Sequence, residues 1–136
     1  MGATTLIYLI LCLSLTFNPQ RSLSPYLLRA NTYPDGLPDS IPTVSVLIPA
    51  RNEEQNIRTC LGALMQQDFP KLEIIVIDDQ STDTTAEVVR EFQGKSTAIT
   101  LISGKELPPG WMGKNYALYQ GVQEAGGEYL LFLDIK

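Results

Sequence analysis

After residue 42, hydrophobic residues in this chain follow two alternating patterns. Short apolar runs bounded by turn-forming residues cover residues 43–48, 72–77 and 99–102, and a fourth run begins at residue 128 or 129. Runs of this kind are typical of parallel strands that are buried on both faces. The segments between them carry apolar residues at spacings of three and four, which predicts amphipathic helices. This alternation predicts an α/β, Rossmann-like fold with a mostly parallel, doubly wound sheet and right-handed crossovers.

Each predicted helix has a start or stop signal in the sequence. The first has Asn52 as its N-cap, acidic residues in its first turn and Phe69-Pro70 at its end. The second starts at Thr84, which stands at capping-box spacing from Glu87. The third is stopped by Gly126-Gly127. The residues expected to face the sheet are Ile57, Cys60, Leu61, Leu64, Met65, Ala86, Val89, Phe92, Ala117, Leu118, Val122 and Ala125.

The first 42 residues differ in composition from the remainder. Residues 3–17 form an uncharged, mostly apolar stretch inside a predicted N-terminal membrane segment, residues 1–20. As a helix this stretch would measure about 22 Å, less than the ~30 Å of a hydrocarbon core. A short anchor, a signal peptide and an apolar arm that does not span are all compatible with it, and we favour the anchor. Residues 21–42 are a predicted linker to the folded domain at residues 43–136.

Positive charges give this segment a predicted orientation. No Lys or Arg precedes Arg21, and both Arg21 and Arg29 follow the apolar stretch. Such residues concentrate on the cytoplasmic side of membrane segments. We therefore expect a membrane-associated protein whose domain faces the cytoplasm.

Composition narrows the chemistry of the domain. The 136-residue chain has a net charge of −5 and no histidine. This argues against a nucleic-acid-binding surface and leaves acid–base chemistry to Asp and Glu. Cys12 and Cys60 have no partner at metal-ligand spacing, so we interpret both as buried residues of the membrane segment or the core.

Polar residues follow three of the four predicted strands. Arg51-Asn52-Glu53-Glu54 follows the first strand, Asp78-Asp79 the second and Asp134 the fourth. Because parallel strands present ligand sites at their carboxyl ends, these side chains predict a pocket for a sugar nucleotide and its metal. The Gly-x-Gly-x-x-Gly turn and the Walker sequence are both absent, which argues against a dinucleotide-binding domain and a P-loop.

These blocks carry a family resemblance. Residues 44–54, 77–85 and 132–134 resemble the N-terminal, nucleotide-sugar-binding half of a family 2 glycosyltransferase with the GT-A fold. Residues 107–115 further resemble the membrane-associated members linked to hopanoid or carotenoid glycosylation. The resemblance implies transfer of a sugar from a nucleotide-diphosphate sugar to an acceptor, and it suggests a lipid as that acceptor.

The resemblance also assigns roles to individual residues. It implies that the donor base and ribose are bound by Pro49, Asn52, Glu53, Asp78 and Asp79. It places Lys114 against the diphosphate, and it places Asp134 at the ribose and at a divalent Mg or Mn ion. Carboxylates suit the nucleoside because they accept hydrogen bonds from base N–H groups and ribose hydroxyls. Ser81 and Asp83 are interpreted as part of a turn and a helix start.

The last residues depart from the family pattern. An Asp-x-Asp sequence is expected there, but the chain reads Asp134-Ile135-Lys136, so a lysine stands in place of the second acid. We expect the GT-A sheet to be truncated after its fourth strand, with the acceptor site and the general base missing. By this expectation no catalytic residue can be named, and the chain alone is an inactive donor-binding half.

Three other interpretations stay open from the sequence. A noncatalytic remnant would bind nucleotide or a partner chain in the same crevice. A sugar-1-phosphate nucleotidyltransferase has a similar sheet, but it needs a Gly-rich, Arg-containing loop after the first strand, which residues 49–54 do not supply. A plain α/β domain would use the acids only to cap helices.

Overall fold

The computed structural model describes residues 41–135. Four strands and three helices alternate along this part of the chain: β1 (Val44–Ala50), α2 (Glu54–Leu64), β2 (Leu72–Asp78), α3 (Thr85–Gln93), β3 (Ile99–Ser103), α4 (Gly113–Glu124) and β4 (Tyr129–Phe132). All strand pairs are parallel, and the sheet order is β3-β2-β1-β4. The predicted α/β fold is confirmed, and the strands lie within two residues of their predicted bounds.

Residues 1–40 and Lys136 lie outside the described residues, and so do the predicted membrane segment, most of the linker and Cys12. Within residues 41–135, no helix combines the length and the apolar character that crossing a membrane requires.

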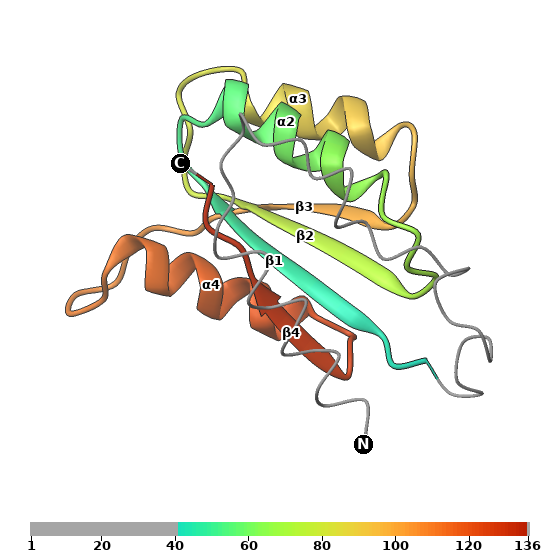
Figure 1. Cartoon of the computed structure of the whole chain (residues 1–136). Coiled ribbons are helices and arrows are strands. Elements are labelled where there is room, and N and C mark those ends of the chain that lie inside the picture. Colours follow the sequence, from blue (N-terminus) through green and yellow to red (C-terminus); the bar gives the residue numbers. More distant parts are fainter. Residues whose placement is uncertain (1–40, 136) are drawn as a thin grey trace.

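The helices cover the two faces of the sheet unequally. Figure 1 shows α2 and α3 together on one face and α4 on the other. The chain first moves outward through β1, β2 and β3, and it then crosses back so that β4 pairs with the opposite side of β1. The strand order therefore reverses between β1 and β4. In parallel sheets, ligand crevices form at such a reversal, at the carboxyl ends of the strands.

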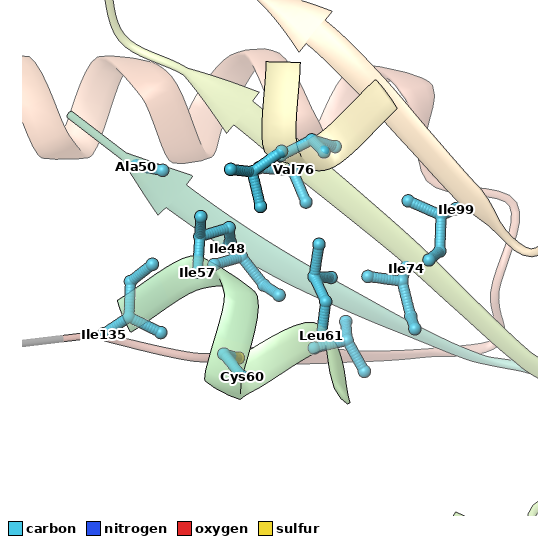
Figure 2. Packing of buried hydrophobic residues seen from close by; sticks show 12 residues of the cluster. Ile48, Ala50, Ile57, Cys60, Leu61, Ile74, Val76, Ile99 and Ile135 are labelled. Atoms are coloured by element: carbon cyan, nitrogen blue, oxygen red, sulfur yellow. The ribbon is translucent and has the colours of Figure 1, made fainter. Parts of the chain in front are cut away.

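The central strand β1 shows why the apolar runs are nearly uninterrupted. Val46 and Ile48 pack in a cluster with residues of α2 and α3, part of which is shown in Figure 2. Leu47, which lies between them, packs in a second cluster with Ala117 of α4. Successive strand residues point to opposite faces, so a strand covered on both faces needs apolar residues throughout. Each fully buried aliphatic side chain contributes roughly 1.5–3 kcal/mol.

The predicted cap at Asn52 is wrong, whereas Thr84 takes the N-cap position of α3 as expected but without the hydrogen bonds of a capping box. Asn52 has a φ of 55°, and Glu53 takes the N-cap position of α2 without a side-chain cap hydrogen bond. Thr84 does precede α3, but its hydroxyl donates to the Glu54 carboxylate instead of capping its own helix. Glu87 pairs with Arg90, at 3.6 Å, and not with the cap residue. The side chains of Asn52 and Thr84 thus bond to the neighbouring turn and not to their own helices.

The predicted inward helix faces are mostly confirmed. Ile57, Cys60 and Leu61 are buried in α2, but Met65 is 40% exposed because the helix ends at Leu64, before Phe69-Pro70. The prediction missed the buried Thr85 and Val88 in α3, where Val89 is buried and Phe92 packs against the core as expected. In α4 and just after it, the predicted residues Ala117, Leu118, Val122 and Ala125 contact the core, and Gln120 and Gly121, which were not predicted, are buried as well.

Cys60 is a buried core residue, as the sequence indicates. Its side chain lies in the cluster between the sheet and α2 (Figure 2). Burial raises the pKa of its thiol to about 12, so the thiol stays protonated at neutral pH.

At the amino ends of the strands, one polar network links β1, β2 and the loop before β4. The buried Ser45 hydroxyl donates to the Glu73 carboxylate and accepts from the Gly127 N–H at 2.8 Å. The same carboxylate accepts from the Gly126 N–H at 3.0 Å. This network fixes the loop between α4 and β4 against β1 and β2, and it thereby sets where β4 starts.

We expect Gly127→Ala to destabilise the fold. A Cβ at Gly127 would lie 2.5 Å from Ser45 Oγ and 2.7 Å from Ser45 N, so the backbone must shift. Overpacking of this kind costs about 1–3 kcal/mol. The neighbouring Gly126→Ala is the matched control, because its nearest contacts would be Glu73 oxygens at 3.9 Å and 4.0 Å. Thermal unfolding of both variants measures the difference, and equal melting temperatures would contradict the close approach.

Candidate functional site at the carboxyl edge of the sheet

The turns after β1 and β2 are locked to each other by hydrogen bonds. The Asn52 N–H donates to Ser81 Oγ at 3.0 Å, and Asn52 Oδ1 accepts from the Thr82 N–H at 2.8 Å. The Glu54 carboxylate accepts from the Thr84 hydroxyl at 2.7 Å. Register explains the proximity, since Ala50 of β1 lies opposite Asp78 of β2. Two segments about thirty residues apart in the sequence thus form one rigid edge.

A second set of bonds joins the starts of α2 and α3. The Glu53 N–H donates to Thr85 Oγ1 at 2.9 Å, and the Glu54 N–H donates to the Asp83 carboxylate at 3.3 Å. The Thr85 hydroxyl donates to Asp83 as well. Chiefly through this hydroxyl, and also through the Thr85 and Glu54 N–H groups, the pKa of Asp83 is lowered from its ordinary value. The structural interpretation of Ser81 and Asp83 is therefore confirmed.

This network holds the backbone in an unusual conformation at two positions. Asn52 has a φ of 55° and Gln80 has a φ of 59°, so each of the two turns contains one left-handed residue that is not glycine. The conformation costs roughly 1–2 kcal/mol per residue, and Asn tolerates it better than most residues. Residues in such conformations cluster at functional sites, where the surrounding contacts hold them in place.

Asp78 ends β2 and Asp79 follows it, and the two carboxylates make different contacts. Asp78 Oδ1 accepts from the Ser81 N–H at 3.1 Å, which closes the turn. The Asp79 side chain is 18% exposed and lies 3.9 Å from the Arg51 guanidinium. A Cβ on Gly113 would be 3.3 Å from Asp79 Oδ2, so the N-terminus of α4 passes directly beside this carboxylate. The Asp79 carboxylate thus lies between Arg51, in the turn after β1, and the start of α4 on the opposite face of the sheet.

An ion pair joins the start of α4 to the end of β4. Lys114 Nζ lies 2.6 Å from Asp134 Oδ2, and both side chains are about half exposed. Strand alternation explains the meeting. Leu131 and Leu133 pack on the α2 side, so Asp134 falls on the α4 face, whereas Ile135 is again buried with Ile57 and Cys60 (Figure 2).

The structure brings most of the predicted donor-site residues to one edge. Asp78, Asp79, Lys114 and Asp134 stand at the ends of β2 and β4 and at the start of α4. Pro49 differs, because it lies within β1, opposite Ile77.

Two of the predicted donor-site residues, Asn52 and Glu53, already have partners at the edge. Asn52 is bonded to the β2 turn, and the Glu53 carboxylate accepts from Asn56 Nδ2 at 2.7 Å. Sequence reasoning missed the bracing roles of Glu54, Thr84 and Thr85, because no spacing rule connects residues so far apart.

The described residues do not by themselves form the predicted metal site. Among residues 41–135, no three His, Cys, Asp or Glu side chains lie close enough together to hold a metal ion. Asp134, the predicted ligand, is engaged by Lys114. A hard divalent cation prefers several oxygen ligands, so this edge by itself does not supply a metal site.

An aromatic cluster next to Lys114 was not predicted. The Trp111 ring lies 5.3 Å from the Tyr116 ring and 5.2 Å from the Tyr119 ring, measured between centroids. Trp111 is 43% exposed, Tyr119 48% and Met112 72%. The signal was present in the sequence, because Trp111 and Met112 precede the helix that carries Lys114. Exposed apolar side chains gathered in this way mark binding surfaces more often than isolated ones do.

Comparison with known proteins shows which family this part of the chain belongs to. The glycosyl transferase family 2 model matches residues 45–135. A 4,4'-diaponeurosporenoate glycosyltransferase from Staphylococcus haemolyticus is 38% identical over 109 residues, which are 80% of this chain and 28% of the relative. The chain therefore spans less than a third of that relative's length.

Two examples illustrate the solved structures that share the fold. The Pyrobaculum calidifontis mannosyltransferase PcManGT, solved with GDP-Man and Mn2+, has a TM-score of 0.60 and 30% identity, over 82% of this chain and 34% of that one. S. aureus TarS, solved with UDP-GlcNAc, has a TM-score of 0.55 and 35% identity, over 68% of this chain and 26% of that one. Both relatives were thus solved with a nucleotide-diphosphate sugar.

We expect Asp83→Asn to destabilise the protein in a pH-dependent manner. Because the folded-state pKa of Asp83 is depressed, its carboxylate stabilises the fold above the unfolded-state pKa of about 3.9. That contribution is lost as the pH falls through the lower, folded-state pKa. The melting temperature of the variant should lie below wild type at pH 7, and the two should converge in strong acid. Glu106→Gln, at an exposed loop position, is the control. A constant gap down to pH 2 would contradict the assignment.

Proposed function

The chain belongs to glycosyl transferase family 2, and from this premise we propose that its carboxyl edge binds the nucleotide-diphosphate sugar from which a glycosyltransferase transfers the sugar. The observation that carries the proposal is the convergence of Asp79, Lys114 and Asp134, from three different elements, at the reversal between β1 and β4. A parallel sheet presents ligands at this place.

The charges at the edge suit the two ends of the donor. Asp78 ends β2, the strand next to β1, and Asp79 follows it; both carboxylates can accept hydrogen bonds from a base N–H or from ribose hydroxyls. Lys114 offers a positive charge for the diphosphate, at a helix start that has no acidic residue in its first turn. Asn52 and Glu53 would shape the wall of the nucleoside site through the locked turns, and Pro49 would contribute from the last residues of β1.

The reaction itself is a displacement at the sugar C1. An acceptor hydroxyl forms a new bond to C1, the bond from C1 to the diphosphate oxygen breaks, and the nucleoside diphosphate leaves with the electron pair. A general base must take the hydroxyl proton. We assign no described residue to that step, so this chain contributes donor binding and positioning. Lys114 would stabilise the charge that develops on the leaving diphosphate.

We propose an apolar, lipid-like acceptor. The relative from S. haemolyticus is named a 4,4'-diaponeurosporenoate glycosyltransferase. The exposed cluster of Trp111, Met112 and Tyr119 lies within a few residues of Lys114 in the sequence, so an apolar acceptor resting on it would be near the diphosphate. Membrane association through residues 3–17, with the domain in the cytoplasm, would bring such an acceptor within reach.

Asp79→Asn should weaken nucleotide binding. Loss of a charged hydrogen bond costs about 1.5–3 kcal/mol, which is roughly a tenfold to hundredfold rise in Kd. Calorimetric titration of the full chain with UDP and with GDP measures the change, and thermal unfolding shows that the variant is folded. Glu106→Gln is the control. Unchanged affinity in Asp79→Asn would favour a plain α/β domain, whereas binding without any sugar transfer would favour a noncatalytic remnant.

The aromatic cluster can be tested through its own fluorescence, because Trp111 is the only tryptophan in the sequence. Oleate, added below its micelle concentration as an apolar probe, should shift the Trp111 emission to shorter wavelength. Tyr119→Ala should raise the apparent Kd for oleate about fivefold to tenfold, since burying an aromatic contact contributes about 1 kcal/mol or more. Tyr129→Ala on β4 is the matched control, because Tyr129 is similarly exposed at 40%. Equal effects of the two variants would argue against this acceptor surface.

A further inference from the structure

The contact between Lys114 and Asp134 is unusual among the ion pairs of residues 41–135. At 2.6 Å it is shorter than the pairs Arg51–Asp79, Arg58–Glu91 and Arg90–Glu87, which range from 2.9 to 3.9 Å. It also joins two elements that meet at the proposed donor site. Both side chains are about half exposed, so water competes for them and the pair adds little to stability. A pair of this kind can exchange partners at small cost.

Lys114 could exchange the Asp134 carboxylate for another anion. Lys114 stands in the first turn of α4, where the helix dipole adds positive potential and which contains no acidic residue of its own. The Asp134 carboxylate occupies the place next to this ammonium. A diphosphate brought to the same ammonium carries a larger negative charge, and it would be repelled by the carboxylate. Asp134 and a diphosphate would therefore compete for Lys114.

Geometry disagrees with the metal role that resemblance assigns to Asp134. The described residues do not gather three metal-binding side chains, and the residue two positions after Asp134 in the sequence is Lys136 instead of an acid. A carboxylate held by an ammonium is also less available to a divalent cation, because both positive groups need the same oxygen atoms.

Resting on the proposed function, we propose that Asp134 is the counter-ion that holds Lys114 in place before the donor binds, and that the diphosphate displaces it. Asp134 is then a positioning residue and not a metal ligand. Nucleoside diphosphate binding by this chain follows as a metal-independent exchange of one anion for another at Lys114.

The test is calorimetric titration of the full chain with UDP and with GDP in the presence of EDTA. Asp134→Asn removes the competing charge and should lower the Kd about fivefold, as expected for an exposed ion pair of about 1 kcal/mol. Lys114→Met should raise the Kd about tenfold or more, as expected for a lost charged hydrogen bond. In the double variant the gain from Asp134→Asn should disappear, because no ammonium is left to release. Adding Mn2+ should change the wild-type Kd less than twofold, which is smaller than the fivefold and tenfold effects expected of the variants.

The test has a matched control variant, and different outcomes contradict the counter-ion role and the proposed function. Glu91→Gln breaks the Arg58–Glu91 pair, which has similar exposure and joins α2 to α3, and it should leave the Kd unchanged. Weaker binding by Asp134→Asn, or an effect of this variant that depends on added Mn2+, would overturn the counter-ion role while wild-type binding still supports the proposed function. A wild-type chain that unfolds cooperatively but binds neither nucleotide would overturn both.

Discussion

Burial of β1 between β2 and β4 is the constraint on which the rest of the structure depends. β1 is hydrogen-bonded on both edges and covered on both faces, and Val46, Leu47 and Ile48 are fully buried. A strand in this position cannot slip by one residue without moving its apolar side chains to the wrong face. Register is therefore fixed, and with it the positions at which β1, β2 and β4 release their polar residues at one edge.

The second level of order is polar. Once register has placed the ends of β1 and β2 side by side, the two turns satisfy each other: Asn52 bonds to Ser81 and Thr82, and Glu54 bonds to Thr84. These contacts take the place of ordinary helix caps, and they hold two residues in left-handed conformations. The result is a preorganised wall, since the groups that shape the edge are already bonded before a ligand arrives.

The third level is electrostatic and joins the two faces of the sheet. Asp79 lies beside the N-terminus of α4, and Lys114 of the same helix reaches Asp134 after β4. The family relatives solved with GDP-Man and Mn2+ or with UDP-GlcNAc share this fold. In this chain the ion pair engages the carboxylate that the resemblance gives to a metal, so the nucleotide sugar is proposed here without the metal ion.

Local patterns of the sequence determined the strands, the helices and most inward-facing residues, because burial on both faces requires continuous apolar runs and helices need a regular apolar stripe. They also indicated which polar residues follow the strands. Tertiary structure alone decided how those residues are used. Thr84 faces a carboxylate thirty residues away instead of its own helix, and Asp134 meets Lys114. Such pairings depend on the reversal of strand order between β1 and β4 and on strand register, which bring together side chains that no local spacing connects.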